Sequence, residues 1–292
     1  MKKIYLLALG ALSLAACSSN ESSETTTEEM ASTTPTLEML WESDTTLVTP
    51  ESVIYDSKND VYYVSCINGV PPSEADGDGY ISKLGTDGKV VELKWVTGLS
   101  APKGMAIVDD VLYVTDIKDI VAINIADGSI KQKWTIDDAE FLNDAAAADN
   151  GDLFFTDSNL NTIHKLSNGE LSVLYKDDAL GGSNGIYIDG DTFYVAGFMD
   201  GKFQKSSIAT PSLTLVADSL PGGDGVEKYQ DGFFVSNWNG EVSYVDADGM
   251  KSKLIDTKDQ KINAADIEVV ADKNVLLIPT FFANKVVAYT IK

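Results

Sequence analysis

A short phrase recurs six times along this 292-residue chain, each time with one polar residue at the start of an apolar, strand-like run. The polar residues stand 52, 40, 41, 40 and 42 positions apart. A repeat of about forty residues with strand-like content is typical of a β-propeller, in which each repeat forms one four-stranded blade. The sequence therefore predicts an all-β, six-bladed β-propeller. The six polar residues, called the axial column below, are Glu51, Lys103, Asn143, Asn184, Asp224 and Asp266.

Two further columns follow the same period. A second strand rich in β-branched and aromatic residues comes after each phrase, as expected for strands packed between blades. These strands read VYYVS, VLYVT, DLFFT, TFYVA, GFFVS and VLLIP. Pairs that tolerate positive φ mark tight hairpins at the same period. They are Asp87-Gly88, Asp127-Gly128, Asn168-Gly169 and Asp248-Gly249.

The ends of the repeat indicate how the ring closes. The sixth repeat stops after its third strand, NKVVAYTIK, whereas LEMLWESDT near the N-terminus resembles the fourth strands of other repeats. Trp41, Trp95 and Trp134 align across these segments. We therefore expect the N-terminal strand to complete the last blade and remove an open sheet edge. The first repeat carries extra residues, which fall in a loop at 68–80.

The N-terminus has the pattern of a secretory signal. Lys2 and Lys3 precede an apolar run that is too short to span a bilayer. The run ends LAAC, which resembles a bacterial lipobox and implies cleavage before Cys17 and lipid attachment there; an ordinary signal peptide is the alternative. We expect a signal peptide at 1–16, a disordered acidic tether at 17–36 and the propeller at 37–292. This organisation predicts a lipid-anchored protein of a bacterial cell envelope.

Charge and cysteine content limit the partners. The net charge is −23, so nucleic acid binding is not expected. All 22 basic residues are lysine, so no bidentate arginine clamp exists. With Cys17 lipidated, Cys66 has no disulfide partner, and we expect it to pack near the end of a second strand. We expect a monomer that binds a small-molecule substrate and contacts the membrane only through its lipid.

The axial column is the candidate site, because the innermost strand of each blade starts near the central axis. Five of its six members offer oxygen ligands, and Lys103 is the only cation. Such hard donors suit Ca²⁺, with Mg²⁺ or Mn²⁺ possible, and suit zinc or copper poorly. The alternative is that these residues only hydrogen-bond the strand starts or face a water-filled channel.

The phrases Pro50-Glu51-Ser52, Asn143-Asp144, Ser183-Asn184-Gly185 and Gly223-Asp224-Gly225 resemble those of the gluconolactonase/regucalcin (senescence marker protein) family of six-bladed propellers. The resemblance implies that Glu51, Asn184 and Asp224 coordinate a catalytic divalent metal. It also implies that Asn143 helps to hold substrate and that Asp224 is the general base for lactone hydrolysis. Asp266 and Asn143 are possible additional axial ligands.

Departures from the family pattern put the substrate in question. Phe141 stands where the family's lactonases have an arginine, and Lys103 and Asp266 fill axial positions that lack such charges there. The carboxylate at the sixth position resembles the related paraoxonase and diisopropylfluorophosphatase propellers. Their histidine pair cannot exist here, because His164 is the only histidine. It falls in a third strand, away from the axis, where we expect a solvated surface residue.

The leading hypothesis is a Ca²⁺-dependent hydrolase of a lactone or another small ester, with Asp224, Asn143 and Lys103 as catalytic candidates. Lys103 either recognises an anion or pairs with Asp266, and we slightly favour the pairing. The second hypothesis is a non-catalytic, envelope-anchored propeller that binds a ligand or a protein partner. In the third, calcium is purely structural.

Overall fold

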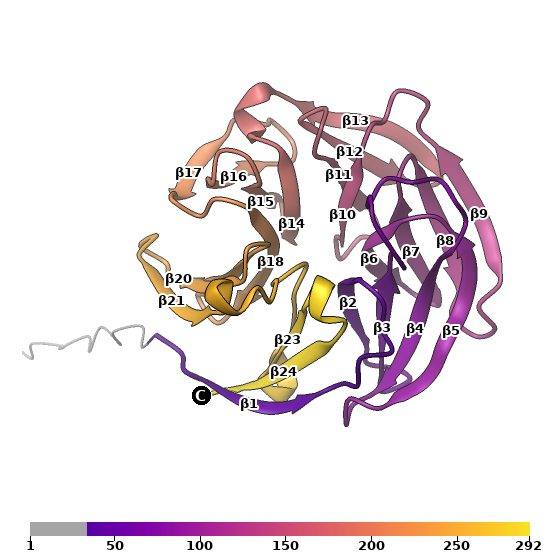
Figure 1. Cartoon of the computed structure of the whole chain (residues 1–292). Helices are drawn as coiled ribbons and strands as arrows, with labels where there is room; N and C mark the ends of the chain where they lie inside the picture. The colour runs from indigo at the N-terminus through magenta and orange to yellow at the C-terminus, as the bar shows by residue number, and fades with distance from the viewer. Residues whose placement is uncertain (1–33) are drawn as a thin grey trace, which may run out of the picture. The chain divides into compact units, whose positions relative to one another are not determined.

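The computed structural model describes residues 34–292, which form six four-stranded antiparallel sheets arranged in a ring (Figure 1). This confirms the predicted six-bladed propeller. The first five blades follow chain order from the axis outward. Their strands are β2 (Pro50–Asp56), β3 (Val61–Cys66), β4 (Gly79–Gly85) and β5 (Val90–Leu99); β6 (Pro102–Val108), β7 (Val111–Asp116), β8 (Asp119–Asn124) and β9 (Ile130–Thr135); β10 (Leu142–Ala147), β11 (Leu153–Asp157), β12 (Thr162–Ser167) and β13 (Glu170–Lys176); β14 (Ser183–Asp189), β15 (Thr192–Gly197), β16 (Phe203–Ser207) and β17 (Thr214–Ala217); β18 (Gly223–Tyr229), β19 (Gly232–Asn237), β20 (Glu241–Val245) and β21 (Lys251–Asp256).

The sixth blade joins the two ends of the described chain. It contains β22 (Glu268–Val270), β23 (Val275–Pro279), β24 (Val286–Ile291) and, outermost, β1 (Leu37–Glu42). β1 pairs antiparallel with β24, with Leu37 opposite Ile291 (Figure 1). The N-terminal strand therefore closes the ring, as the sequence predicts. Four short 3₁₀ turns are η1 (Asp178–Leu180), η2 (Lys258–Gln260), η3 (Ala271–Lys273) and η4 (Phe281–Ala283).

The core is divided among the blade interfaces. Six buried apolar clusters each lie between two neighbouring blades. For example, Val53 and Tyr62 of blade 1 pack against Leu277 of blade 6. Because each blade is covered on both faces, side chains on both faces of its middle strands are buried.

The tryptophan and hairpin-glycine columns act together. A tryptophan in an outermost strand lies against the hairpin turn of the next blade. Gly88 has φ +78°, and a Cβ there would lie 2.4 Å from the Trp41 ring, so only glycine fits. Trp134 Nε1 donates to Gly169 O at 3.3 Å. The three pairs are Trp41–Gly88, Trp95–Gly128 and Trp134–Gly169.

The innermost strands carry β-bulges at the axial column. In each of the first five blades the strand pairing shifts register next to the axial residue. A bulge re-aims a side chain and leaves a backbone N–H without its ladder partner. Hydroxyls of the second strand accept three of these N–H groups: Ser65 from Ser52 at 2.9 Å, Thr156 from Asp144 at 2.9 Å, and Ser236 from Gly225 at 2.7 Å. The bulges therefore fix where the axial side chains point.

Two other sequence predictions concern the remaining residues. Cys66 ends β3 and is buried, as expected, and it is free within the described residues. The signal peptide, Cys17 and most of the tether lie outside the described residues. Within residues 34–292, no helix has the length and apolar character needed to cross a bilayer.

Candidate active site

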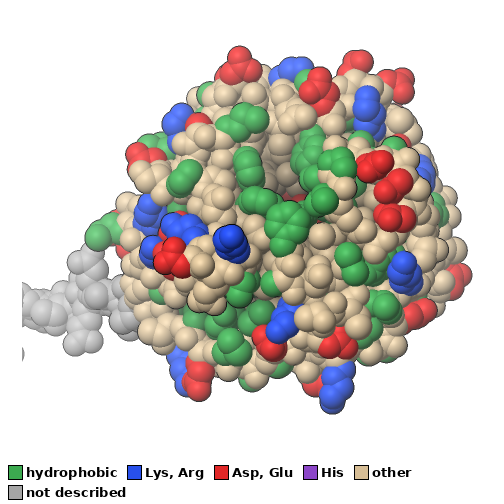
Figure 2. Space-filling model, in the orientation of Figure 1, with side chains coloured by type: hydrophobic (Ala, Val, Ile, Leu, Met, Phe, Trp, Pro, Cys, Tyr) green, Lys and Arg blue, Asp and Glu red, His purple; other side chains and the backbone are tan. Residues whose placement is uncertain are grey.

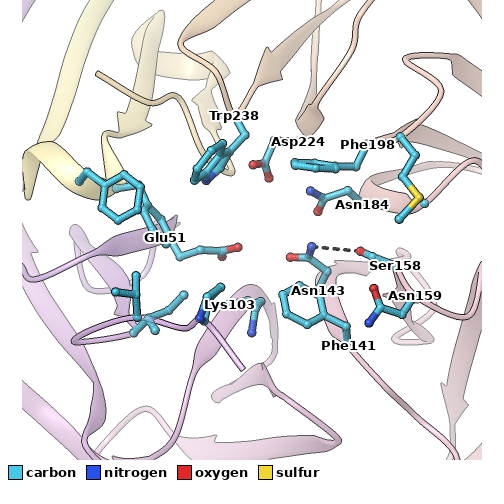
Figure 3. Close-up of a pocket in the computed structure, with 17 residues that line it drawn as sticks. Glu51, Lys103, Phe141, Asn143, Ser158, Asn159, Asn184, Phe198, Asp224 and Trp238 are labelled. Atoms are coloured by element: carbon cyan, nitrogen blue, oxygen red, sulfur yellow. Dashed lines mark hydrogen bonds between the residues drawn. The ribbon is translucent and has the colours of Figure 1, made fainter. Parts of the chain in front are cut away.

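Five of the six axial-column residues line one pocket of about 380 Å³ at the centre of the ring. They come from β2, β6, β10, β14 and β18, one from each of the first five blades. In Figure 3 the side chains of Glu51, Asn143, Asn184 and Asp224 point toward the middle of this pocket. The volume lies within the range of about 300–1,000 Å³ that is usual for small-molecule sites.

Three buried oxygens in this pocket have no hydrogen-bond partner within residues 34–292. They are Glu51 Oε2, Asn184 Oδ1 and Asp224 Oδ1. Buried acceptors are nearly always paired, because an unpaired one costs about 1–3 kcal/mol. Three unpaired oxygens from three different blades therefore mark acceptor capacity that the scaffold itself does not use.

The electrostatics of the two pocket carboxylates agree with this. Burial raises the pKa of Glu51 well above its usual value, and repulsion from Asp224 raises it further. Burial likewise raises the pKa of Asp224, with repulsion from Asp266 and Asp144 added. A cation bound between the two carboxylates would lower both pKa values.

The donor set fits a hard divalent cation. Two carboxylates and one amide supply oxygen only, which is the ligand chemistry of Ca²⁺ and Mg²⁺. Within residues 34–292, no group of three or more His, Cys, Asp or Glu side chains is arranged to hold a metal ion. The candidate set therefore depends on the amide of Asn184, and two carboxylates alone do not make the site.

Lys103 lies in the same pocket but does not pair with Asp266. Only 1% of its surface is exposed. Its ammonium donates to Ala101 O at 3.0 Å and lies 4.4 Å from the centre of the Phe141 ring. Within the described residues no ion pair joins Lys103 to Asp266, so the favoured pairing is wrong. Desolvation lowers the pKa of Lys103 to about 8, and the charge of Glu51 opposes this shift.

A hydrogen-bond chain holds the amide of Asn143. Its Nδ2 donates to Ser158 Oγ at 3.1 Å (Figure 3). Ser158 Oγ in turn donates to Ser183 O at 2.8 Å, in the next blade. These hydrogen bonds fix the orientation of the Asn143 amide, because the atom that donates to Ser158 is Nδ2 and the other is Oδ1.

Asp266, the sixth axial residue, does not line the pocket. Its Oδ2 accepts from Ser52 Oγ at 2.6 Å, and its backbone N–H donates to Glu51 O at 3.0 Å. It belongs to a second group near the axis, called the scaffold carboxylates here: Asp144, Glu227, Asp266 and Glu268.

The scaffold carboxylates accept backbone or hydroxyl hydrogen bonds. Asp144 accepts from the N–H groups of Ala145 at 2.6 Å and Ile186 at 2.7 Å. Glu268 Oε1 accepts from Tyr55 N at 3.1 Å. Glu227 and Glu268 line a different hollow that shares no lining residue with the pocket. The repeat pattern did not single out Asp144, Glu227 and Glu268, although Asp144 directly follows an axial residue.

Residues of the pocket wall form another column, which was not among those predicted from the sequence. Ile67, Ser158, Phe198 and Trp238 of the wall each directly follow a second strand, and Phe281 lies two positions after the end of β23. With Ile117 included, the column has spacings of 50, 41, 40, 40 and 43 residues. The period was therefore present in the sequence. The extra loop of blade 1 adds Val70 and Pro72 to the wall.

The surroundings of His164 differ from the prediction. It lies in β12, a third strand, as expected, and does not line the pocket. It is only 5% exposed, however, and its Nε2 has no partner within the described residues. The expected solvated position was wrong because the neighbouring blades cover both faces of the middle strands.

The fold and the pocket define the class: a six-bladed β-propeller with a polar axial site of small-molecule size. No protein-family model and no curated protein matches the sequence. Solved structures do share the fold. A catalytically inactive histidine-to-alanine variant of virginiamycin B lyase from Staphylococcus aureus, with quinupristin, aligns with TM-score 0.62 and 14% identity over 88% of this chain and 99% of that one.

Two other structures align similarly. The selenomethionine-substituted virginiamycin B lyase from Staphylococcus aureus gives TM-score 0.64 and 12% identity over 88% of this chain and 99% of that one. A streptogramin B lyase gives TM-score 0.63 and 14% identity over 89% and 98%. At such identities the likeness establishes the propeller fold and not the reaction.

Proposed function

We propose that this chain is a divalent-metal-dependent hydrolase of a lactone or small ester, with Ca²⁺ held by Glu51, Asn184 and Asp224. The observation that carries the proposal is that each of these residues has a buried oxygen without a hydrogen-bond partner among the residues that the structure describes. The resemblance to the gluconolactonase/regucalcin phrases selects the same three positions. Two independent lines, one from sequence and one from hydrogen bonding, thus support one site.

The bound cation would act as a Lewis acid on the substrate carbonyl. The roles of the chain's own groups follow from their contacts. Asp224 lines the pocket and would accept the proton of the attacking water. Asn143, held by Ser158, orients the acyl group. Lys103 places a positive charge beside the pocket, although Phe141 and Ala101 O already contact its ammonium.

A lyase reaction like that of the structural neighbours finds no support in the residues present. In virginiamycin B lyase a histidine-to-alanine change gives a catalytically inactive enzyme. Here the only histidine, His164, lies in β12 and does not line the axial pocket.

The test compares metal, turnover and one variant in the same purified protein. Calcium binding is measured by calorimetry, and hydrolysis of lactones and aryl esters is followed with and without chelator. We expect chelation to abolish turnover, calcium to restore it, and Asp224→Asn to lower kcat/KM about a thousandfold. An Asp224→Asn enzyme as active as wild type would exclude this mechanism.

The same experiment separates the alternatives. Calcium binding without any turnover would favour the ligand-binding propeller, for which the apolar wall of the pocket is the supporting observation. A large fall in melting temperature on chelation, again without turnover, would favour a structural ion. We also propose that processing at Cys17 anchors the protein to the cell envelope, which metabolic labelling with a fatty acid and a Cys17→Ser control would test.

A further inference from the structure

The polar floor of the pocket is surrounded by an aromatic wall. Trp238 lies edge-on to Phe281 and Phe282, with ring centres 5.8 and 5.9 Å away. Phe281 and Phe282 are themselves 4.8 Å apart and perpendicular. Phe198 and Met199, which follow β15 in the neighbouring blade 4, also line the pocket. Such edge-to-face contacts fix the rings and make the wall a preformed surface.

This wall remains exposed at the mouth of the pocket. Met199 is 73% exposed and Phe282 is 52% exposed. Figure 2 shows hydrophobic side chains gathered around the hollow at the centre of this face. Large apolar side chains around a concave polar site are typical of ligand pockets, because leaving them in water costs free energy.

The wall offers few partners for hydroxyl groups. Its polar side chains are Ser158 and Asn159. The Ser158 hydroxyl already accepts from Asn143 and donates to Ser183 O. A polyhydroxylated acyl group would leave its water hydrogen bonds without replacement on this surface, which is unfavourable.

Among the described residues, the pocket has no side chain placed to clamp an anionic acyl group. The chain carries no arginine, and the charges of Glu51 and Asp224 would be neutralised by the proposed cation. The ammonium of Lys103 is covered by Phe141 on one side and by Ala101 O on another. An uncharged acyl group is therefore favoured.

We propose that the substrate is an uncharged lactone or ester carrying an alkyl or aromatic group, which lies against Phe198, Trp238 and Phe282 while the acyl carbon sits over the polar floor. This inference rests on the proposed function for its reaction and on the aromatic wall for its specificity. In the reaction, water oxygen bonds to the acyl carbon and the C–O bond to the leaving oxygen breaks. The leaving oxygen takes a proton and becomes the hydroxyl of the hydroxy acid from a lactone, or the alcohol from an ester. The carboxylic acid formed releases one proton to solution.

Released protons provide the assay, with γ-butyrolactone, γ-octalactone, γ-decalactone and glucono-δ-lactone as probes. Each buried methylene contributes about fourfold in affinity for the transition state. We expect kcat/KM to rise about 250-fold from γ-butyrolactone to γ-octalactone, which has four more carbons, with glucono-δ-lactone the poorest substrate. Binding of the γ-lactones is measured separately by calorimetry in chelator, where hydrolysis is not expected.

Two variants locate the effect. Phe282→Ser removes an exposed wall ring and should lower kcat/KM for γ-decalactone about tenfold more than for γ-butyrolactone. Met199→Ser is a second wall variant, in case Phe282→Ser folds poorly. Met250→Ser is the matched control: it is 68% exposed and lies outside the pocket, so it should leave the chain-length dependence unchanged.

The outcomes distinguish this inference from the proposed function. A preference for glucono-δ-lactone would overturn the inference and support the hydrolase. Chain-length-dependent binding without turnover would support the apolar site and overturn the hydrolase. Equal binding of short and long lactones, or a Met250→Ser effect as large as that of Phe282→Ser, would overturn the inference.

Discussion

Two groups of carboxylates near the propeller axis differ in how their oxygens are used. The scaffold carboxylates accept hydrogen bonds from the fold: Asp144 from two backbone N–H groups, Asp266 from Ser52 and Glu268 from Tyr55. The pocket carboxylates, Glu51 and Asp224, each keep a buried oxygen without a partner within residues 34–292.

The difference divides acids of one chemical type into those whose oxygens the fold uses as acceptors and those that keep an unused oxygen. Burial raises the pKa values of both groups, so a shifted pKa does not distinguish them. The hydrogen bonds of the carboxylate oxygens do distinguish the two groups. An acceptor that bonds to a backbone N–H of a neighbouring blade stabilises the ring, whereas an unpaired acceptor in an open pocket is available to a ligand.

The largest expected contrast comes from the same isosteric change in each group. Glu51→Gln removes a proposed metal ligand and should lower kcat/KM at least about a thousandfold, with calcium affinity reduced as well. Glu268→Gln should leave kcat/KM within about threefold, because a glutamine oxygen can still accept from Tyr55 N. Lactone turnover and calcium calorimetry on the two proteins measure this.

Two results would contradict the expected difference between Glu51→Gln and Glu268→Gln. Equal losses of activity in both variants would show that the acids act as one network. An active Glu51→Gln enzyme would show that the unpaired oxygen of Glu51 does not hold the cation.

Stability should show the opposite ranking. Asp144→Ala leaves the N–H groups of Ala145 and Ile186 without their acceptor, and should lower the free energy of unfolding by about 3 kcal/mol. Asn184→Ala removes an oxygen that pairs with nothing in the described chain and should cost about 1 kcal/mol in chelator. Urea unfolding of both proteins at one pH measures the difference. A costlier Asn184→Ala would mean that the pocket amide is also structural.

The pH dependence of the metal-free protein gives a smaller effect. Burial raises the pKa of Glu268 from its usual range to about 8. The folded state then binds the proton more tightly than the unfolded chain, so the stabilisation is complete below about pH 4.5 and is lost as pH rises through 8. Because Glu268 is partly exposed, we expect a loss of about 2 kcal/mol between pH 5 and 8 from this group.

Glu268→Gln should flatten that slope. Unfolding by urea in chelator at pH 5, 6.5 and 8 compares the variant with wild type. An unchanged slope would assign the pH dependence to the other axial acids, whose pKa values are also raised, such as Asp266 at about 6.

The sequence predicted the pocket group better than the scaffold group, for a physical reason. The repeat of about forty residues fixes where each innermost strand begins. In the first five blades a β-bulge at that point directs the axial side chain into the pocket. In the sixth blade β22 is only three residues long and pairs with β23 without a register shift. The side chain of Asp266 accordingly bonds to Ser52 and does not line the pocket.

Scaffold contacts depend on distances between blades, which a single sequence does not contain. That Asp144 accepts from Ile186 follows only once blades 3 and 4 are placed side by side. The aromatic wall is different. Phe198 and Trp238 follow the period of forty residues, and a search for apolar residues just beyond each second strand would have found them.

The smallest prediction removes one hydroxyl from each group. Ser158→Ala leaves the Asn143 amide without its acceptor and Ser183 O without this donor. It should lower kcat/KM about fivefold to tenfold and the free energy of unfolding by about 1 kcal/mol. Ser52→Ala removes the donor to Asp266 and should lower the free energy of unfolding by a similar amount, about 1 kcal/mol, with kcat/KM within about twofold. Both changes delete one oxygen atom next to the axis, so the difference lies in turnover, which is measured on the two variants at equal stability. If Ser52→Ala lowered turnover as much as Ser158→Ala, the division of the axis into a ligand site and a scaffold would be wrong, because the hydroxyl that bonds to a scaffold carboxylate would then also serve the ligand site.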